Sequence, residues 1–86
     1  MANLWTGVVE TKTAYVSLAE ESEVTFTNGE SYILQNLSED NVFFVREGSV
    51  GEGFKIKPLE KFQFNASNQT LYVYVPFGKC KINIGK

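Results

Sequence analysis

The sequence contains no histidine and only one cysteine, Cys80, among its 86 residues. Without histidine, the chain lacks the commonest general base and the commonest protein ligand for transition metals. A single cysteine excludes an internal disulfide, whereas small secreted domains often depend on several, so we expect a reducing compartment. A catalytic thiol would also need a neighbouring base. Because Cys80 alternates with Ile82 and Ile84, we interpret it as a core residue.

Motifs for phosphate binding, metal binding and carboxylate catalysis are missing as well. The Gly-rich segment 47–53 (EGSVGEG) is not followed by the Lys-Ser/Thr pair of a phosphate loop. Glu39-Asp40 and Glu47 could meet across a hairpin, but acidic residues in turns usually serve turn formation and solubility. No spacing typical of EF-hands, zinc sites or dinucleotide-binding folds is present. We therefore predict that the protein is not an enzyme and holds no cofactor or metal.

The chain also lacks a strong charge of either sign and a long hydrophobic run. Eight Lys and Arg against ten Asp and Glu give a net charge of −2, with no basic stripe that could neutralise nucleic-acid phosphates. No apolar run approaches the roughly 18 residues of a membrane-spanning helix. The first residues do not have the charged and then apolar regions of a secretory signal. We expect cytoplasmic synthesis without export, and neither a nucleic-acid nor a membrane partner.

What the sequence does contain is a series of short segments in which apolar and polar residues alternate. From residue 23 onward they recur at a spacing of roughly 8–12 residues, which is typical of antiparallel sandwiches and barrels. In two of these segments Phe54, Ile56, Phe62 and Phe64 are predicted to face the core. We predict an all-β fold, a small antiparallel β-sandwich or barrel of about seven short strands. The predicted strands are residues 23–27, 31–37, 41–47, 53–57, 61–65, 70–77 and 79–84.

The first 22 residues alternate less regularly than the rest. They are either the first strand or strands of a sheet or an arm that lies on a neighbouring subunit. Residues 14–22 (AYVSLAEES) are the best helix candidate, but Thr13 and Val16 are strand-forming residues, so we predict a strand or arm here. The predicted organisation is a segment 1–22, an arm or edge strand, followed by a β-domain 23–86.

Two predicted strands carry apolar residues on both faces. In residues 70–77 (TLYVYVPF), Leu71 and Val73 face one way, while Tyr72 and Tyr74 face the other. Segment 41–47 (NVFFVRE) is apolar over four consecutive residues. Burying one Phe or Tyr side chain contributes about 1.5–3 kcal/mol, so an outer row of such residues indicates that something covers it.

Three coverings are possible. Trp5 and Tyr15 of the N-terminal segment could form a lid; the row could be a subunit interface in a symmetric oligomer; or Trp5, Tyr72 and Tyr74 could stack on the rings of a glycan. The residues predicted to form an interface or a ligand-stacking surface are Trp5, Phe43, Val45, Tyr72 and Tyr74.

A family resemblance adds to these interpretations. Segments 32–36 (YILQN), 42–48 (VFFVREG), 54–62 (FKIKPLEKF) and 71–74 (LYVY) resemble the strand-and-turn pattern of small all-β virion proteins of tailed bacteriophages, of the capsid decoration, head-fibre or tail-associated type. The likeness extends over residues 23–84. It implies a virion component made in the host cytoplasm, which binds the major capsid protein or another virion protein as a symmetric oligomer, a trimer being favoured. The N-terminal segment would then be a docking arm.

Together these observations predict a non-enzymatic structural or assembly module. The alternative is a carbohydrate- or receptor-binding β-module.

Overall fold

The computed structural model describes residues 3–48 and 53–86, and in these residues it contains eight strands and one short helix. Residues 49–52 of the predicted Gly-rich loop lie outside the described residues. The helix is α1 (Leu18–Ser22). The strands are β1 (Asn3–Glu10), β2 (Val16–Ser17), β3 (Ser31–Asn36), β4 (Phe43–Glu47), β5 (Phe54–Ile56), β6 (Lys61–Asn65), β7 (Leu71–Tyr74) and β8 (Lys79–Gly85).

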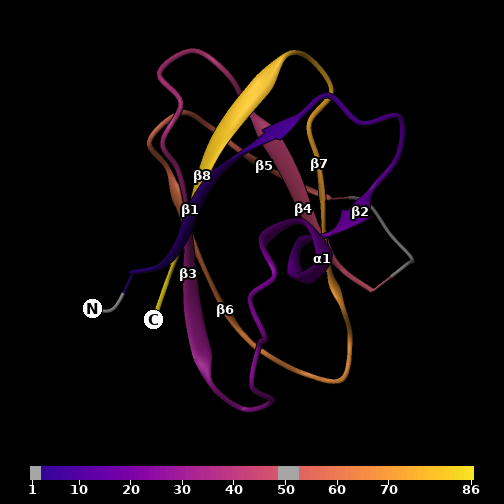
Figure 1. Ribbon diagram of the computed structural model, residues 1–86, viewed down its shortest axis with the longest axis vertical. Helices are drawn as coiled ribbons and strands as arrows, with labels where there is room; N and C mark the ends of the chain where they lie inside the picture. The colour runs from indigo at the N-terminus through magenta and orange to yellow at the C-terminus, as the bar shows by residue number, and fades with distance from the viewer. Residues whose placement is uncertain (1–2, 49–52) are drawn as a thin grey trace.

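The strands form two four-stranded sheets that face each other (Figure 1). Sheet I has the order β1-β8-β3-β6 and sheet II the order β2-β7-β4-β5, and all pairs are antiparallel. The first strand pairs with the last, the second with the seventh, the third with the sixth and the fourth with the fifth. This nested pairing is that of one long hairpin rolled up into two layers, the jelly-roll arrangement. The predicted all-β antiparallel sandwich is confirmed.

The core lies between the two sheets, where alternate side chains of each strand meet. Leu71, Val73 and Val75 are buried while Tyr72 and Tyr74 are half-buried, so the alternation predicted for residues 70–77 is confirmed. Ile56, Phe64, Cys80, Ile82 and Ile84 are also buried, as predicted.

Phe54 lies on the inner side of its strand, opposite the buried Val45, but its expected burial in the core is wrong. Its side chain is 66% exposed because β5 is the last strand of sheet II and no further strand covers it. The ring contacts only the margin of the core, with its centroid 6.1 Å from that of Phe62.

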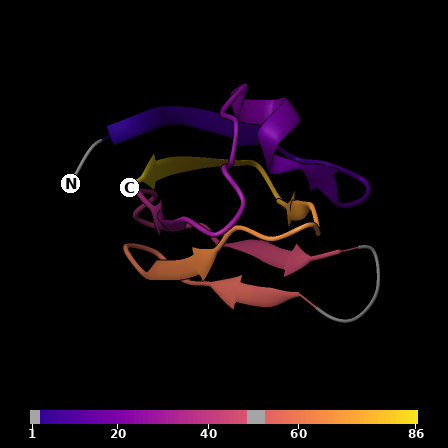
Figure 2. The same ribbon diagram turned by 90° about the horizontal axis from the view of Figure 1, so that it is seen from below.

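The N-terminal segment supplies an edge strand to each sheet. β1 pairs with β8 over most of its length, and β2 pairs with β7. Figure 2 shows β1 and α1 on one side of the molecule and β4 and β5 on the opposite side. The segment is therefore integrated into the sandwich of its own subunit.

The strand or arm predicted over residues 14–22 is wrong from Leu18 onward, where α1 begins. The Ser17 side chain caps the helix by accepting a hydrogen bond from the backbone N–H of Glu20. Glu20 and Glu21 in the first turn interact favourably with the helix dipole. Leu18 is fully buried. These local signals outweigh the β-propensity of the preceding residues.

The strand predicted over residues 23–27 is also wrong. Glu23 has a left-handed backbone, with φ of 62°, and ends α1. Val24 and Phe26 pack against the core, so the alternation of this segment reflects side-chain burial without a hydrogen-bonded partner strand. The nearest strand in sequence, β3, already has β8 and β6 on its two sides.

One buried polar side chain, that of Asn36, ties several elements together. Its Nδ2 donates to the carbonyl oxygens of Asn41 at 2.8 Å and of Ile56 at 3.0 Å. Its Oδ1 accepts from the backbone N–H of Ser38 at 2.9 Å and from the thiol of Cys80 at 3.3 Å. Because Asn36 is fully buried, its amide supplies hydrogen bonds to backbone groups that water cannot reach.

The buried thiol of Cys80 is expected to be unreactive in the folded protein. Burial raises the pKa of Cys80 above its ordinary value of about 8.5, and the hydrogen bonds with Ser38 and Asn36 only partly oppose this. The reactive thiolate is therefore scarce at pH 8. We expect a chromogenic disulfide reagent to label Cys80 in denaturant but hardly at all under native conditions. Equal labelling rates in the two conditions would contradict the buried position.

Candidate functional site

The outer face of sheet II carries a group of aromatic side chains around one arginine. Because side chains alternate along a strand, the outward residues are Phe44 and Arg46 of β4 and Tyr72 and Tyr74 of β7. Phe44 pairs with Tyr74, and Arg46 with Tyr72. The ring centroids of Phe44 and Tyr74 are 6.3 Å apart. Together with Tyr15 these four residues form what we call the aromatic face.

Tyr15, just before β2, lies across the aromatic face. Its ring centroid is 5.4 Å from that of Tyr74, and the guanidinium carbon of Arg46 lies 4.0 Å from its ring centroid. Its hydroxyl hydrogen-bonds with the backbone of Gly53, where a Cβ atom would approach that oxygen to 1.9 Å. Burial raises the pKa of Tyr15, which Arg46 opposes. Gly53 thus leaves the space in which Tyr15 spans the sheet.

The two outer faces of the sandwich differ in character. Outward residues of sheet I include Thr6, Gln35, Lys61 and Asn83, and the Asn83 amide donates to the Thr6 hydroxyl at 2.9 Å. Three aliphatic residues also lie there: Leu4 and Val8, 40% and 53% exposed, and the half-buried Ile33. On sheet II the outward rows hold three tyrosines and a phenylalanine, all half-buried. The outward aromatic residues are therefore concentrated on sheet II, whereas the apolar residues on the outside of sheet I are aliphatic.

The structure brings together Tyr72 and Tyr74 but not the other predicted site residues. Phe43 and Val45 were expected at the interface, and this is wrong: both are fully buried on the inner face of sheet II. The observed alternation of residues 43–46 (FFVR) is shifted by one residue from the predicted one. Arg46 carries the signal that could have corrected it, because a charged residue faces outward and places Phe44 on the same side.

Trp5 lies on the other sheet. It pairs with Ile84 of β8, packs against the core, and has its indole ring over Gly7, where a Cβ atom would come within 2.2 Å of the ring. Trp5 therefore shares no surface with Tyr72 and Tyr74, and the three do not form one stacking platform. Of the two residues predicted to form a lid, only Tyr15 lies over the outward side chains of β4 and β7.

A metal site needs a cluster of ionisable side chains, and a membrane-spanning helix needs sufficient length and apolar character. Across residues 3–48 and 53–86, no three His, Cys, Asp or Glu side chains form a group that could hold a metal ion. No helix in the described part of the chain has the length and apolar character needed to cross a membrane. The aromatic face can contribute packing area and cation–π contacts.

Comparison of the chain with protein-family models, with curated proteins and with solved structures gave no match.

Proposed function

We propose that the protein is a non-enzymatic structural subunit that packs against copies of itself through the aromatic face, in a closed symmetric oligomer. The observation that carries this proposal is the row of Tyr15, Tyr74 and Phe44 on the outside of sheet II, with neighbouring ring centroids 5.4 and 6.3 Å apart. Each ring is still partly exposed, and covering this remaining area contributes a fraction of the roughly 1.5–3 kcal/mol that full burial of such a side chain provides. The outer face of sheet I carries the aliphatic Leu4, Val8 and Ile33 but no comparable row of aromatic rings.

The small size of the chain supports the same proposal. A domain of 86 residues buries only about 60–65% of the surface that its unfolded chain exposes. Oligomerisation is one of the ways in which small domains add to a limited core. An interface on the aromatic face would extend the burial of sheet II to both of its sides.

The most specific form of the proposal is a virion component. The resemblance to small all-β virion proteins of tailed phages supports a trimer that binds a major capsid protein or another virion protein. The jelly-roll arrangement also occurs in viral capsid and lectin domains, which supports this version by analogy of fold.

Carbohydrate or receptor binding through the aromatic face is the second candidate. The partly exposed rings of Tyr72 and Tyr74 favour it, since tyrosine rings stack on the apolar faces of sugars. Glycan-array binding that is lost in Tyr72→Ala would favour this candidate, and an array without signal would leave the structural subunit ahead.

The oligomer is tested by the native mass in solution, measured by size-exclusion chromatography with light scattering. We expect a closed oligomer whose mass falls in Tyr74→Asp, because the new carboxylate would be buried without a partner in the interface. Circular dichroism should retain the β signal. Gln63→Asp places the same charge on the outer face of sheet I and is the matched control.

A monomeric wild type would contradict the proposal. So would a Tyr74→Asp variant that keeps the wild-type mass, or a Gln63→Asp variant that loses mass to the same extent.

A further inference from the structure

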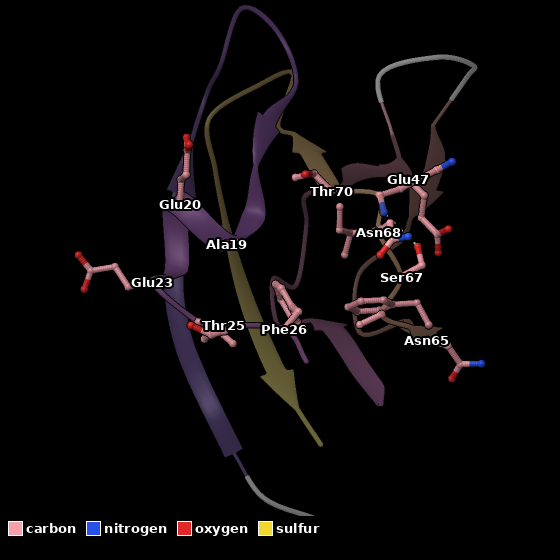
Figure 3. Close-up of a pocket in the computed structure, with 15 residues that line it drawn as sticks. Ala19, Glu20, Glu23, Thr25, Phe26, Glu47, Asn65, Ser67, Asn68 and Thr70 are labelled. Carbon is pink, nitrogen blue, oxygen red and sulfur yellow. Dashed lines mark hydrogen bonds between the residues drawn. The ribbon is translucent and has the colours of Figure 1, made fainter. Parts of the chain in front are cut away.

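A pocket of about 400 Å³ opens between two segments that are distant in the sequence (Figure 3). One wall is residues 19–26, which comprise most of α1 and the extended segment after it. The other wall is residues 64–71, which lead from β6 into β7, with Glu47 at the margin. The pocket is lined by none of the residues of the aromatic face. Its volume falls in the range of about 300–1,000 Å³ that is typical of small-ligand sites.

The floor of the pocket is apolar and includes two aromatic rings. Phe26 from one wall and Phe64 from the other have centroids 5.5 Å apart, at an interplanar angle of 66°. Val24, Ala66 and Leu71 complete the apolar lining. A ligand seated here would place an apolar face against these side chains.

The rim is polar, and several of its groups are available to a ligand. The Thr70 hydroxyl hydrogen-bonds to no other residue within 3–48 and 53–86, and the same is true of Asn68 Nδ2. Asn68 Oδ1 accepts from the Asn28 amide at 3.1 Å, which links the two sides of the opening. Uncharged donors and acceptors therefore lie beside the aromatic floor, and three glutamates also line the pocket.

The charges around the pocket disfavour an anion. No Lys or Arg lines it, whereas three glutamates do. Figure 3 shows the carboxylates of Glu20 and Glu23 pointing away from the opening, so they contribute repulsion at a distance and no direct contact. Glu47 at the margin can accept a hydrogen bond. A neutral ligand fits this lining better than a phosphate or carboxylate.

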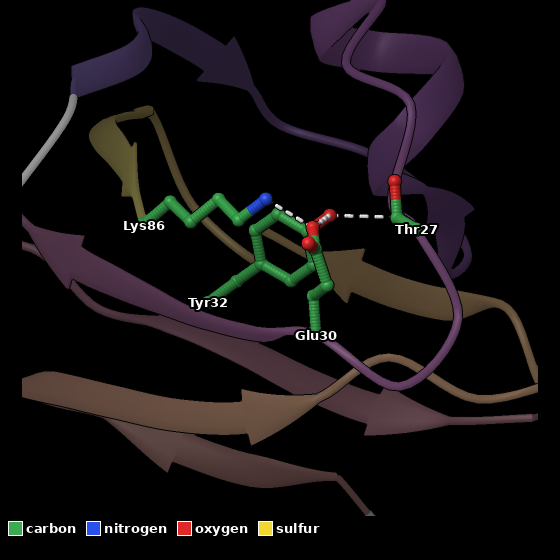
Figure 4. A network of polar contacts seen from close by, with 4 residues as sticks. All are labelled: Thr27, Glu30, Tyr32 and Lys86. Carbon is green, nitrogen blue, oxygen red and sulfur yellow. Dashed lines mark hydrogen bonds and ion pairs between the residues drawn. The ribbon is translucent and has the colours of Figure 1, made fainter.

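The wall that carries Phe26 is held in place from behind (Figure 4). The Tyr32 hydroxyl accepts from the backbone N–H of Thr27 at 2.7 Å and donates to the Glu30 carboxylate, which also pairs with Lys86. The Phe26 ring lies edge-on to the Tyr32 ring, with centroids 4.9 Å apart. A wall fixed in this way lowers the ordering cost of binding.

We propose that this pocket binds one residue of a neutral sugar. The apolar C–H face of a pyranose ring lies against Phe26 and Phe64, and its hydroxyls bond with Asn68 and Thr70. This site is separate from the aromatic face and does not depend on the proposed oligomer.

The test is an NMR titration of ¹⁵N-labelled protein with glucose, galactose, mannose and N-acetylglucosamine, and with glucuronate as the anionic counterpart of glucose. We expect at least one neutral sugar to shift the amide signals of residues 24–26 and 64–71 at millimolar concentrations. Glucuronate should bind more weakly than glucose. Thr70→Val keeps the shape but removes one hydroxyl and should weaken binding about tenfold, the effect of losing one hydrogen bond.

Thr6→Val makes the same substitution on the outer face of sheet I and should leave the titration unchanged. Tyr74→Asp should leave it unchanged too, which separates this site from the oligomer interface. Absence of shifts with every neutral sugar would overturn the proposal. So would shifts confined to the aromatic face, glucuronate binding as tight as that of glucose, or a Thr70→Val variant that binds as well as the wild type.

Discussion

Replacement of Phe43 with alanine is expected to lower the free energy of unfolding by about 3–5 kcal/mol, whereas replacement of its neighbour Phe44 should cost much less. The Phe43 ring is fully buried between the sheets, so its removal leaves a cavity as well as lost apolar contacts. Phe44 is half-buried on the aromatic face. Typical domains have a total stability of about 5–15 kcal/mol, so Phe43→Ala should bring this small chain close to unfolding. Urea denaturation followed by circular dichroism measures both values.

The same pair of variants separates the core from the proposed interface. Phe44→Ala should lower the mass of the oligomer while the subunit stays folded. If Phe43→Ala instead stays as stable as Phe44→Ala and loses oligomer mass, Phe43 belongs to the interface and its burial in the core is refuted.

Substitution of Asn36 by aspartate is the second change with a large expected effect, a loss of about 3–5 kcal/mol at neutral pH. The Asn36 amide donates to two carbonyl oxygens, those of Asn41 and Ile56. An ionised carboxylate cannot donate, so both carbonyls would face a buried negative charge. The change in shape is minimal, which makes the loss a measure of hydrogen bonding and charge. Chemical denaturation over a range of pH tests this prediction.

The loss of stability in Asn36→Asp should decrease as the pH is lowered. Burial should raise the pKa of the new carboxyl in the folded state above its unfolded value of about 3.9. The folded state then binds the proton more tightly, so the deficit is present at neutral pH and shrinks as the pH falls through the folded pKa. Asn65→Asp is the control, because Asn65 is exposed and its Oδ1 only accepts, from Ser31. Its cost should stay within about 0.5 kcal/mol. A deficit in Asn36→Asp that grows toward acid pH would refute the buried site.

The oligomer and the sugar pocket are independent of each other. The first depends on Tyr15, Phe44 and Tyr74 of sheet II, and the second on the walls that carry Phe26 and Phe64. A failure of one therefore leaves the other standing.

Much of the fold follows from local pattern. Period-two alternation in residues 31–36, 61–65, 71–74 and 79–85 predicts the strands there, because a strand with one buried face must alternate. The Asn28-Gly29 signal predicts the turn before β3, and Gly29 has the expected positive φ of 89°. The second apolar row of residues 70–77 correctly indicates a covered or partnered outer surface, since Tyr15 packs there.

Other features arise only when distant segments meet. Residues 23–27 alternate like a strand, but β8 and β6 already pair with both sides of β3. Residues 23–27 therefore pack against the core without pairing with a neighbouring strand. Phe43 and Phe44 are chemically identical, and the register of β4 between β7 and β5 decides which is core and which is surface. The pocket likewise exists because residues 19–26 and 64–71 face each other across about forty positions of sequence. Alternation in the sequence shows that a strand has two faces, but the pairing of strands and the packing of sheets decide which face is buried.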